Sequence, residues 1–171
     1  MKLFKKINNS RKRLLRDQIL KDLKLNQPKT VLDNGCGEDG SWDYSKTPNL
    51  KITKIDKIYG QDSTKLDFPD NSFDCVVFTG VIQYLSEPIK SIQECYRVLK
   101  KNGTLIFPTI NSNSLINNIK GFKKETLVFT QSGIKEIIVK NNFKQNNFKS
   151  IDFKFIPRSR KMIIYIVANK K

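Results

Sequence analysis

The order of hydrophobic and polar residues predicts alternating strands and helices over the first two thirds of the chain. Short apolar runs predict strands at 30–33, 50–56, 73–80 and 104–109. Within the third run, Cys75–Phe78 is apolar without interruption, as expected of a strand buried on both faces. Such alternation is typical of a parallel sheet with right-handed crossovers and helices on both of its faces.

Helices are predicted where apolar residues recur at spacings of three and four. One such stretch is 10–25, which Ser10 is placed to cap. The clearest is 87–100, where Pro88 suits the first turn. A later helix is expected at 132–142, opened by a serine.

The end of the chain predicts two strands, 150–156 and 162–168, joined by a short basic turn. Strands this close together form a hairpin, so one edge of the sheet is expected to be antiparallel. The stretch 57–72 is rich in turn residues, with one brief strand expected near Ile58–Tyr59. The predicted fold is therefore α/β and Rossmann-like, a doubly wound, mostly parallel sheet with an antiparallel C-terminal hairpin.

Charge is distributed unevenly along the 171 residues, whose net charge is +16. Residues 1–25 hold nine basic and two acidic side chains, 26–119 hold ten and eleven, and 120–171 hold thirteen and three. A basic surface binds nucleic acid or an anionic membrane in many proteins. Lysines outnumber arginines 26 to 6, however, and arginine is the preferred phosphate ligand. A general bias in composition is the favoured interpretation, so nucleic acid is not the expected partner.

The reactive residue types exclude several functions. The chain has no histidine, which rules out histidine acid–base chemistry and argues against a zinc site, so no metal is expected. The three cysteines form no C-x-x-C pair, which suits a reducing cytoplasm. Neither a secretory signal nor a membrane-spanning run is visible. We therefore expect a cytoplasmic protein.

A glycine-rich loop with the spacing G-x-G-x-x-G follows the first predicted strand. Its glycines are Gly35, Gly37 and Gly40, and Asp56 ends the next strand. A carboxylate at that position accepts hydrogen bonds from ribose hydroxyls. Enzymes that use dinucleotides and enzymes that use S-adenosylmethionine share both features, because both cofactors contain adenosine.

Charge around the loop separates these two cofactors. Four carboxylates lie before, between or after the glycines: Asp33, Glu38, Asp39 and Asp43. They would repel a pyrophosphate, which favours the positive end of a helix. S-adenosylmethionine has no phosphate and carries a sulfonium and an ammonium group, so an acidic loop favours it.

The stretch "VLDNGCGEDG" resembles motif I of the class I S-adenosylmethionine-dependent methyltransferases. Residues 61–107 are similar to the motifs that follow it in their ubiquinone/menaquinone-biosynthesis-like branch, including Phe-Asp before a buried strand and Glu-x-x-Arg-Val-Leu-Lys. The resemblance covers about 28–110 closely and 125–143 loosely. It implies S-adenosylmethionine as cofactor and S-adenosylhomocysteine as product.

The resemblance also implies a set of residues along the cofactor, at the carboxyl ends of strands. They are Asp33, Gly35 and Gly37 for the methionine and ribose, Asp56 for the ribose hydroxyls, Asp62 and Ser63 for the adenine, and Thr79 and Gly80 for the amino-acid end. For Asp33 and Asp62 the alternative is a capped turn. Glu94 and Arg97 are interpreted as a structural ion pair, and Cys36 as a small buried residue.

The chain departs from the family pattern at two places. Only five residues separate Asp56 from Asp62, so the helix between the second and third strands must be abbreviated. A histidine frequent in the family after strand 73–80 is replaced, and Gln83 and Tyr84 become the candidates for the substrate side. Core packing is an alternative for Tyr84, and no residue is identified as a catalytic base.

These observations predict a single methyltransferase domain over 1–171. It comprises a basic N-terminal helix (1–25), a cofactor-binding core (30–110) and a substrate-side segment with the hairpin (111–171). The expected reaction is methyl transfer to a small-molecule, lipid-like or glycan acceptor, with 108–130 near the acceptor. The alternatives are an RNA or protein methyltransferase and a non-catalytic partner subunit of the same fold. The sequence gives no indication of an oligomeric state.

Overall fold

A six-stranded sheet forms the centre of the protein in a computed structural model that describes residues 2–37, 47, 49–111, 130–151 and 163–171. The strands are β1 (Thr30–Asn34), β2 (Lys51–Ile55), β3 (Phe73–Phe78), β4 (Leu99–Ile110), β5 (Phe143–Ile151) and β6 (Ile163–Lys170). Their order across the sheet is β2-β1-β3-β4-β6-β5.

The sheet is parallel on one side and antiparallel on the other. Strands β2, β1, β3 and β4 run parallel to one another, whereas β6 pairs antiparallel with both β4 and β5. This confirms the mostly parallel sheet with an antiparallel C-terminal hairpin. The chain moves from β1 outward to β2 and then returns to the opposite side of β1 as β3. In open α/β sheets, ligands bind at the carboxyl ends of the strands at such a switch in order.

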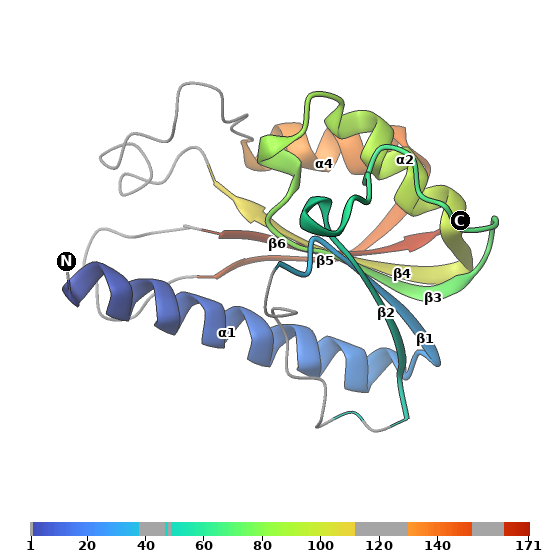
Figure 1. Ribbon diagram of the computed structural model, residues 1–171. Coiled ribbons are helices and arrows are strands. Elements are labelled where there is room, and N and C mark those ends of the chain that lie inside the picture. Colours follow the sequence, from blue (N-terminus) through green and yellow to red (C-terminus); the bar gives the residue numbers. More distant parts are fainter. Residues whose placement is uncertain (1, 38–46, 48, 112–129, 152–162) are drawn as a thin grey trace.

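Helices cover both faces of the sheet, as the alternating pattern predicts (Figure 1). Helix α1 (Lys2–Asn26) lies on one face, and α2 (Pro88–Val98) and α4 (Gln131–Lys140) lie on the other. The α1 face is packed by Leu15, Ile19 and Leu23 against apolar residues of β1, β3, β4 and β6. The opposite core contains the buried residues of α2 and α4, including Ile92, Cys95, Val98, Ile134 and Ile138.

Several predicted boundaries are wrong. Helix α1 begins at Lys2, so Ser10 lies inside it and does not cap it. Thr130, not Ser132, caps α4, since its side chain accepts a hydrogen bond from the Gly133 amide. Strand β5 begins at Phe143, seven residues before the predicted start. The asparagine-rich stretch that follows lacks a strand pattern, but it pairs with β6 on both sides of a register shift between Gln145 and Asn147.

The connection from β2 to β3 is abbreviated. A 3₁₀ helix, Lys57–Tyr59, stands where the brief strand near Ile58–Tyr59 was predicted, because Asp56 caps it and Gly60 ends it in a left-handed conformation. Residues 57–72 are all described and contain no strand, only an isolated bridge between Asp62 and Lys65. The predicted shortening is confirmed, and β2 is an edge strand of the described sheet.

A buried polar contact ties α1 to the sheet. The Tyr165 hydroxyl on β6 donates a hydrogen bond of 2.7 Å to Asp22 Oδ2, and the Gln18 side chain donates a second one of 2.9 Å. Burial of the tyrosine and the adjacent carboxylate raise the pKa of Tyr165 above its ordinary value. The phenol therefore stays protonated and remains a donor to the carboxylate.

Asp74 joins the starts of β1 and β3, and its loss should destabilise the protein. Its carboxylate accepts hydrogen bonds from the backbone amides of Lys29 and Thr30, the Thr30 hydroxyl and the Lys100 ammonium, at 2.8 to 3.0 Å. Burial raises the pKa of this carboxyl, but these donors outweigh it and lower the pKa to about 2.

We therefore expect Asp74→Asn to reduce the free energy of unfolding by about 1–2 kcal/mol at pH 7 in urea titrations. Because the folded pKa is depressed, this contribution is present above the ordinary pKa and is lost as the pH falls toward 2. The difference between wild type and variant should accordingly shrink on acidification. A difference that stays constant between pH 7 and pH 2.5 would contradict the assignment. The exposed Asp67 is the matched control, with little expected effect of Asp67→Asn.

Candidate cofactor site

The turn after β1 is packed closely against the segment that follows β3. Gly35 and Gly37 both have positive φ, 87° and 70°. A Cβ on Gly35 would lie 1.9 Å from Val81 Cγ2 and 2.9 Å from the Thr79 carbonyl oxygen. The amides of Gly35 and Cys36 donate to the Ile55 carbonyl at 2.9 and 3.2 Å. Only glycine fits at position 35, which fixes this turn between the carboxyl ends of β2 and β3.

Asp56 faces the same turn from the end of β2. Its Oδ2 accepts a hydrogen bond of 2.9 Å from the Gly37 amide, and its Oδ1 accepts one of 3.2 Å from the Ile58 amide. The Gln61 side chain accepts from the Asp56 amide at 3.2 Å. A carboxylate has about four acceptor positions, so Asp56 retains lone pairs for a further donor such as a hydroxyl.

Asp62 and Ser63 follow in the short connection after β2. Asp62 Oδ1 accepts from both the amide and the hydroxyl of Thr64 at 2.8 Å, and these bonds lower the pKa of Asp62. Asp62 therefore forms the capped turn that was the alternative reading of this residue, and the turn leaves Oδ2 for other donors. The buried Ser63 hydroxyl donates to Asn34 Oδ1 at 2.6 Å.

Two buried polar atoms without a hydrogen-bond partner in the described structure follow the end of β3. They are Thr79 Oγ1 and Gln83 Oε1. The Thr79 amide donates to the Asn34 carbonyl at 3.1 Å, and Gln83 Nε2 donates to the Gly80 carbonyl at 2.7 Å. An unpaired buried polar atom is costly in a folded protein, so Thr79 Oγ1 and Gln83 Oε1 are candidate positions for a ligand that supplies the missing partner.

The two substrate-side candidates differ in position. Gln83 is 3% exposed, whereas the next side chain, Tyr84, is 68% exposed. Tyr84 therefore does not pack in the core, which was its alternative reading. Gln83 is the one of the pair with a buried polar atom available beside the turn.

Asp33 lies near this edge but on the other face of the sheet. Leu32 packs with the α2 core and Val31 with the α1 core, so alternation places Asp33 toward α1 and Asn34 toward α2. The Asp33 side chain is fully buried. Burial, followed by the charges of Asp33 and Asp56, raises the pKa of Cys36. Cys36 is 1% exposed and stays a thiol, as expected of a buried small residue.

Sequence reasoning missed Asn34 and Val81. The fully buried Asn34 joins three parts of the site, through Ser63, the Thr79 amide and, at 3.8 Å, Cys95 Sγ on α2. A polar residue that ends an apolar strand just before the glycines was the available signal. No pattern identified Val81, because its importance comes from its packing against Gly35 across the turn.

Of the remaining sequence-based assignments, one is confirmed, and the others fall on residues that the structure does not describe. Glu94 and Arg97 form the expected structural ion pair, at 2.8 Å. Residues 38–46, which include Glu38, Asp39, Gly40 and Asp43, are not among the described residues, nor is most of the expected acceptor segment 108–130.

The sheet order is that of an open α/β protein, and in such proteins ligands bind at the carboxyl ends of strands, the edge at which β1, β2 and β3 end here. Residues 43–107 match the family described as "Methyltransferase domain". Among curated relatives is the ubiquinone/menaquinone biosynthesis C-methyltransferase UbiE of Citrobacter koseri, 33% identical over 36% of this chain and 24% of its own length. The chain spans less than half the length of two uncharacterized relatives from Methanocaldococcus jannaschii, 48% and 44%.

Solved structures share the fold. The PH0226 protein of Pyrococcus horikoshii superposes with a TM-score of 0.68 at 21% identity, covering 96% of this chain and 91% of its own. The 1,6-didemethyltoxoflavin-N1-methyltransferase of Burkholderia thailandensis, solved with S-adenosylhomocysteine, gives 0.65 at 15% identity, over 84% of this chain and 72% of its own. The methyltransferase match is therefore confined to residues 43–107, and the solved structures show that the fold is shared with proteins of this kind.

Proposed function

We propose that the protein transfers a methyl group from S-adenosylmethionine to a small-molecule, lipid-like or glycan acceptor. The observation that carries this proposal is the convergence of the Gly35–Gly37 turn, Asp56 and the unpaired atoms of Thr79 and Gln83 at one edge of the sheet. Carboxylates at this edge suit a cofactor with a sulfonium and an ammonium group. They suit a pyrophosphate poorly.

Each residue has a role that its contacts permit. Asp56, already hydrogen-bonded to the Gly37 amide, accepts from the ribose hydroxyls with its remaining lone pairs. The Ser63 hydroxyl already donates its hydrogen bond to Asn34 Oδ1, so its oxygen is left to accept, which suits the adenine amino group. Asp62 accepts from the same group with Oδ2. Thr79 and Gly80 contact the amino-acid end, and Asp33 acts through its charge beside the turn.

When bound, S-adenosylmethionine supplies a methyl group on a positively charged sulfur. In-line transfer depends mainly on alignment of the acceptor, and alignment supplies much of the rate. Gln83 is placed to orient the acceptor through its unpaired Oε1, because Nε2 is held by the Gly80 carbonyl at 2.7 Å. The exposed Tyr84 is available at the outer side of the same segment.

Isothermal titration calorimetry with S-adenosylmethionine and S-adenosylhomocysteine tests the cofactor site. We expect both to bind, and Asp56→Asn to weaken binding by about tenfold or more, because a carboxylate acceptor for two hydroxyls is replaced by an amide. Asp67→Asn, an exposed carboxylate in the loop after the site, is the matched control and should bind as wild type. No binding together with a clear NADH signal would contradict the proposal. No cofactor uptake of any kind would favour a non-catalytic partner subunit.

A further inference from the structure

The face of α1 that is turned away from the sheet carries leucines. Leu14 is 40% exposed and Leu25 is 70% exposed. At 3.6 residues per turn, Leu14, Lys21 and Leu25 lie within about 40° of one line along the helix. This apolar line, formed by Leu14 and Leu25, follows the outer side of α1.

This line is separate from the residues that hold α1 on the sheet. The inner face is formed by Leu15, Ile19 and Leu23, which are 9% exposed or less. Leu14 and Leu25 belong to neither buried core. Single exposed leucines are ordinary, but leucines aligned on one face of a helix need a separate explanation.

Basic side chains flank the apolar line, and they outnumber the one exposed acidic side chain of α1, which belongs to Asp17. Exposed Arg13, Lys21 and Lys24 lie on the outer side. Of the two acidic residues of α1, Asp17 pairs with Arg16 at 3.4 Å. Asp22 is buried and accepts from Tyr165. The outer face, defined here as Arg13, Leu14, Lys21, Lys24 and Leu25, spans about a third of the helix circumference, with Arg13 and Lys24 to one side of the leucines and the exposed Asp17 within the same arc. This face is therefore apolar and carries a net positive charge.

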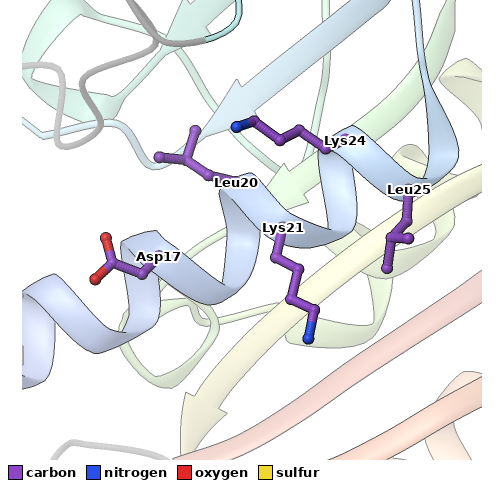
Figure 2. Close-up of a pocket in the computed structure, with 5 residues that line it drawn as sticks. All are labelled: Asp17, Leu20, Lys21, Lys24 and Leu25. Carbon is purple, nitrogen blue, oxygen red and sulfur yellow. The ribbon is translucent and has the colours of Figure 1, made fainter.

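A shallow hollow of about 400 Å³ opens on this helix, lined by Asp17, Leu20, Lys21, Lys24 and Leu25. Figure 2 shows Lys21 and Leu25 projecting on the same side of the helix, with Leu20 and Lys24 on another. Each lysine thus lies beside a leucine. Lysine stems can cover apolar surface while their ammonium groups reach anionic groups above it.

We propose that the outer face of α1 docks on a membrane surface that contains anionic lipids. The helix lies in the plane of the headgroups, with Leu14 and Leu25 inserted and Arg13, Lys21 and Lys24 on lipid phosphates. It lies on the membrane and does not cross it, because no helix among the described residues is long and apolar enough to do so. The proposal goes beyond the methyl-transfer reaction and is independent of its acceptor.

The composition of this face favours a membrane over the other occupants. A nucleic acid would be contacted by arginines and aromatic side chains, and residues 13–26 contain two arginines and no aromatic residue. Docking of a second copy on the same face would bring like charges together. Aligned leucines between lysines match the interface between headgroups and acyl chains.

Co-sedimentation of the full chain with lipid vesicles tests the proposal. The probes are vesicles of pure phosphatidylcholine and vesicles with about 30% phosphatidylglycerol. We expect at least about tenfold tighter binding to the anionic vesicles. The Arg13→Gln/Lys21→Gln/Lys24→Gln variant should lose about tenfold or more of that affinity. Leu14→Ser/Leu25→Ser, which keeps every charge, should also lose about tenfold.

The matched control is Lys57→Gln/Lys101→Gln/Lys144→Gln, which removes three exposed charges from other elements. It should stay within about twofold of wild type, because lipid contact falls off within a Debye length. Equal losses for both charge variants would overturn the proposal, since binding would then follow net charge alone. So would unchanged binding of the leucine variant, or binding of a single-stranded RNA without binding to anionic vesicles. Thermal melts check that each variant is folded.

Discussion

Gly35→Ala is expected to lower the free energy of unfolding by about 2–4 kcal/mol. The new Cβ would lie 1.9 Å from Val81 Cγ2 and 2.9 Å from the Thr79 carbonyl oxygen, and φ at this position is +87°. The valine methyl can rotate away, but the Thr79 carbonyl is backbone at the end of β3 and cannot. Chemical denaturation of the variant measures the loss. The same displacement should weaken S-adenosylmethionine binding, because the turn lies beside Asp56.

Gly60 provides the matched control. Its φ is +78°, close to that of Gly35, but an added Cβ would meet no atom within 4 Å. Gly60→Ala should therefore cost only the backbone preference, about 1 kcal/mol. Adding Val81→Ala to Gly35→Ala should recover part of the loss, because the side-chain clash is removed while the carbonyl and φ remain. Equal costs at positions 35 and 60 would contradict the packing explanation.

The strands and their order could be expected from the sequence to a large extent, and the ends of the helices could not. Buried runs such as Cys75–Phe78 are unambiguous, because both faces of that strand are covered. The start of α1 was missed because its apolar stripe toward the sheet begins only near Leu15. The start of β5 was missed because cross-strand pairing with β6 overrides the polar composition of the segment.

The individual candidate residues were chosen from motif order and remain predictions, whereas their surroundings could not be predicted from the sequence. Asp56 was expected to meet a ribose, yet its contact with the Gly37 amide depends on how β2 and the turn come together in space. Gln83 and Tyr84 were indistinguishable in sequence, and only burial separates them. Hydrogen-bond partners from distant segments leave no local pattern, which is why Asn34 was overlooked.

Arg97 should be the second large determinant of stability, because it holds the shortened connection to α2. Its guanidinium donates to both carboxylate oxygens of Glu94 at 2.8 and 2.9 Å, and to Asp70 Oδ1 at 2.9 Å. It also donates to the carbonyls of Leu66 and Phe68, both at 2.7 Å. These bonds fix residues 66–70, part of the turn-rich connection expected between β2 and β3.

Arg97→Ala is expected to cost about 2–4 kcal/mol in the free energy of unfolding, because two backbone carbonyls lose their side-chain donor and the Glu94 carboxylate keeps only the Leu66 amide, at 2.8 Å. Arg97→Lys should recover little, since one ammonium cannot reproduce the planar fork. The exposed pair of Lys90 and Glu87, at 3.5 Å, is the control: Lys90→Ala should change stability by about 0.5 kcal/mol or less.

A pH titration distinguishes the hydrogen bonds of Arg97 from simple packing of its side chain. Hydrogen bonding to Arg97 is the largest cause that lowers the pKa of Glu94 below its ordinary value. The stabilisation is therefore present above the ordinary pKa of glutamate and is lost as the pH falls through the lower folded value. Wild type should lose stability over that range more steeply than Arg97→Ala, so that their denaturation midpoints converge. Parallel pH profiles, or a stability cost no larger than that of Lys90→Ala, would show that Arg97 acts only by packing its aliphatic stem over the loop. The shortened connection would then owe its shape to Phe68 and Phe73, whose rings pack edge to face at 5.1 Å.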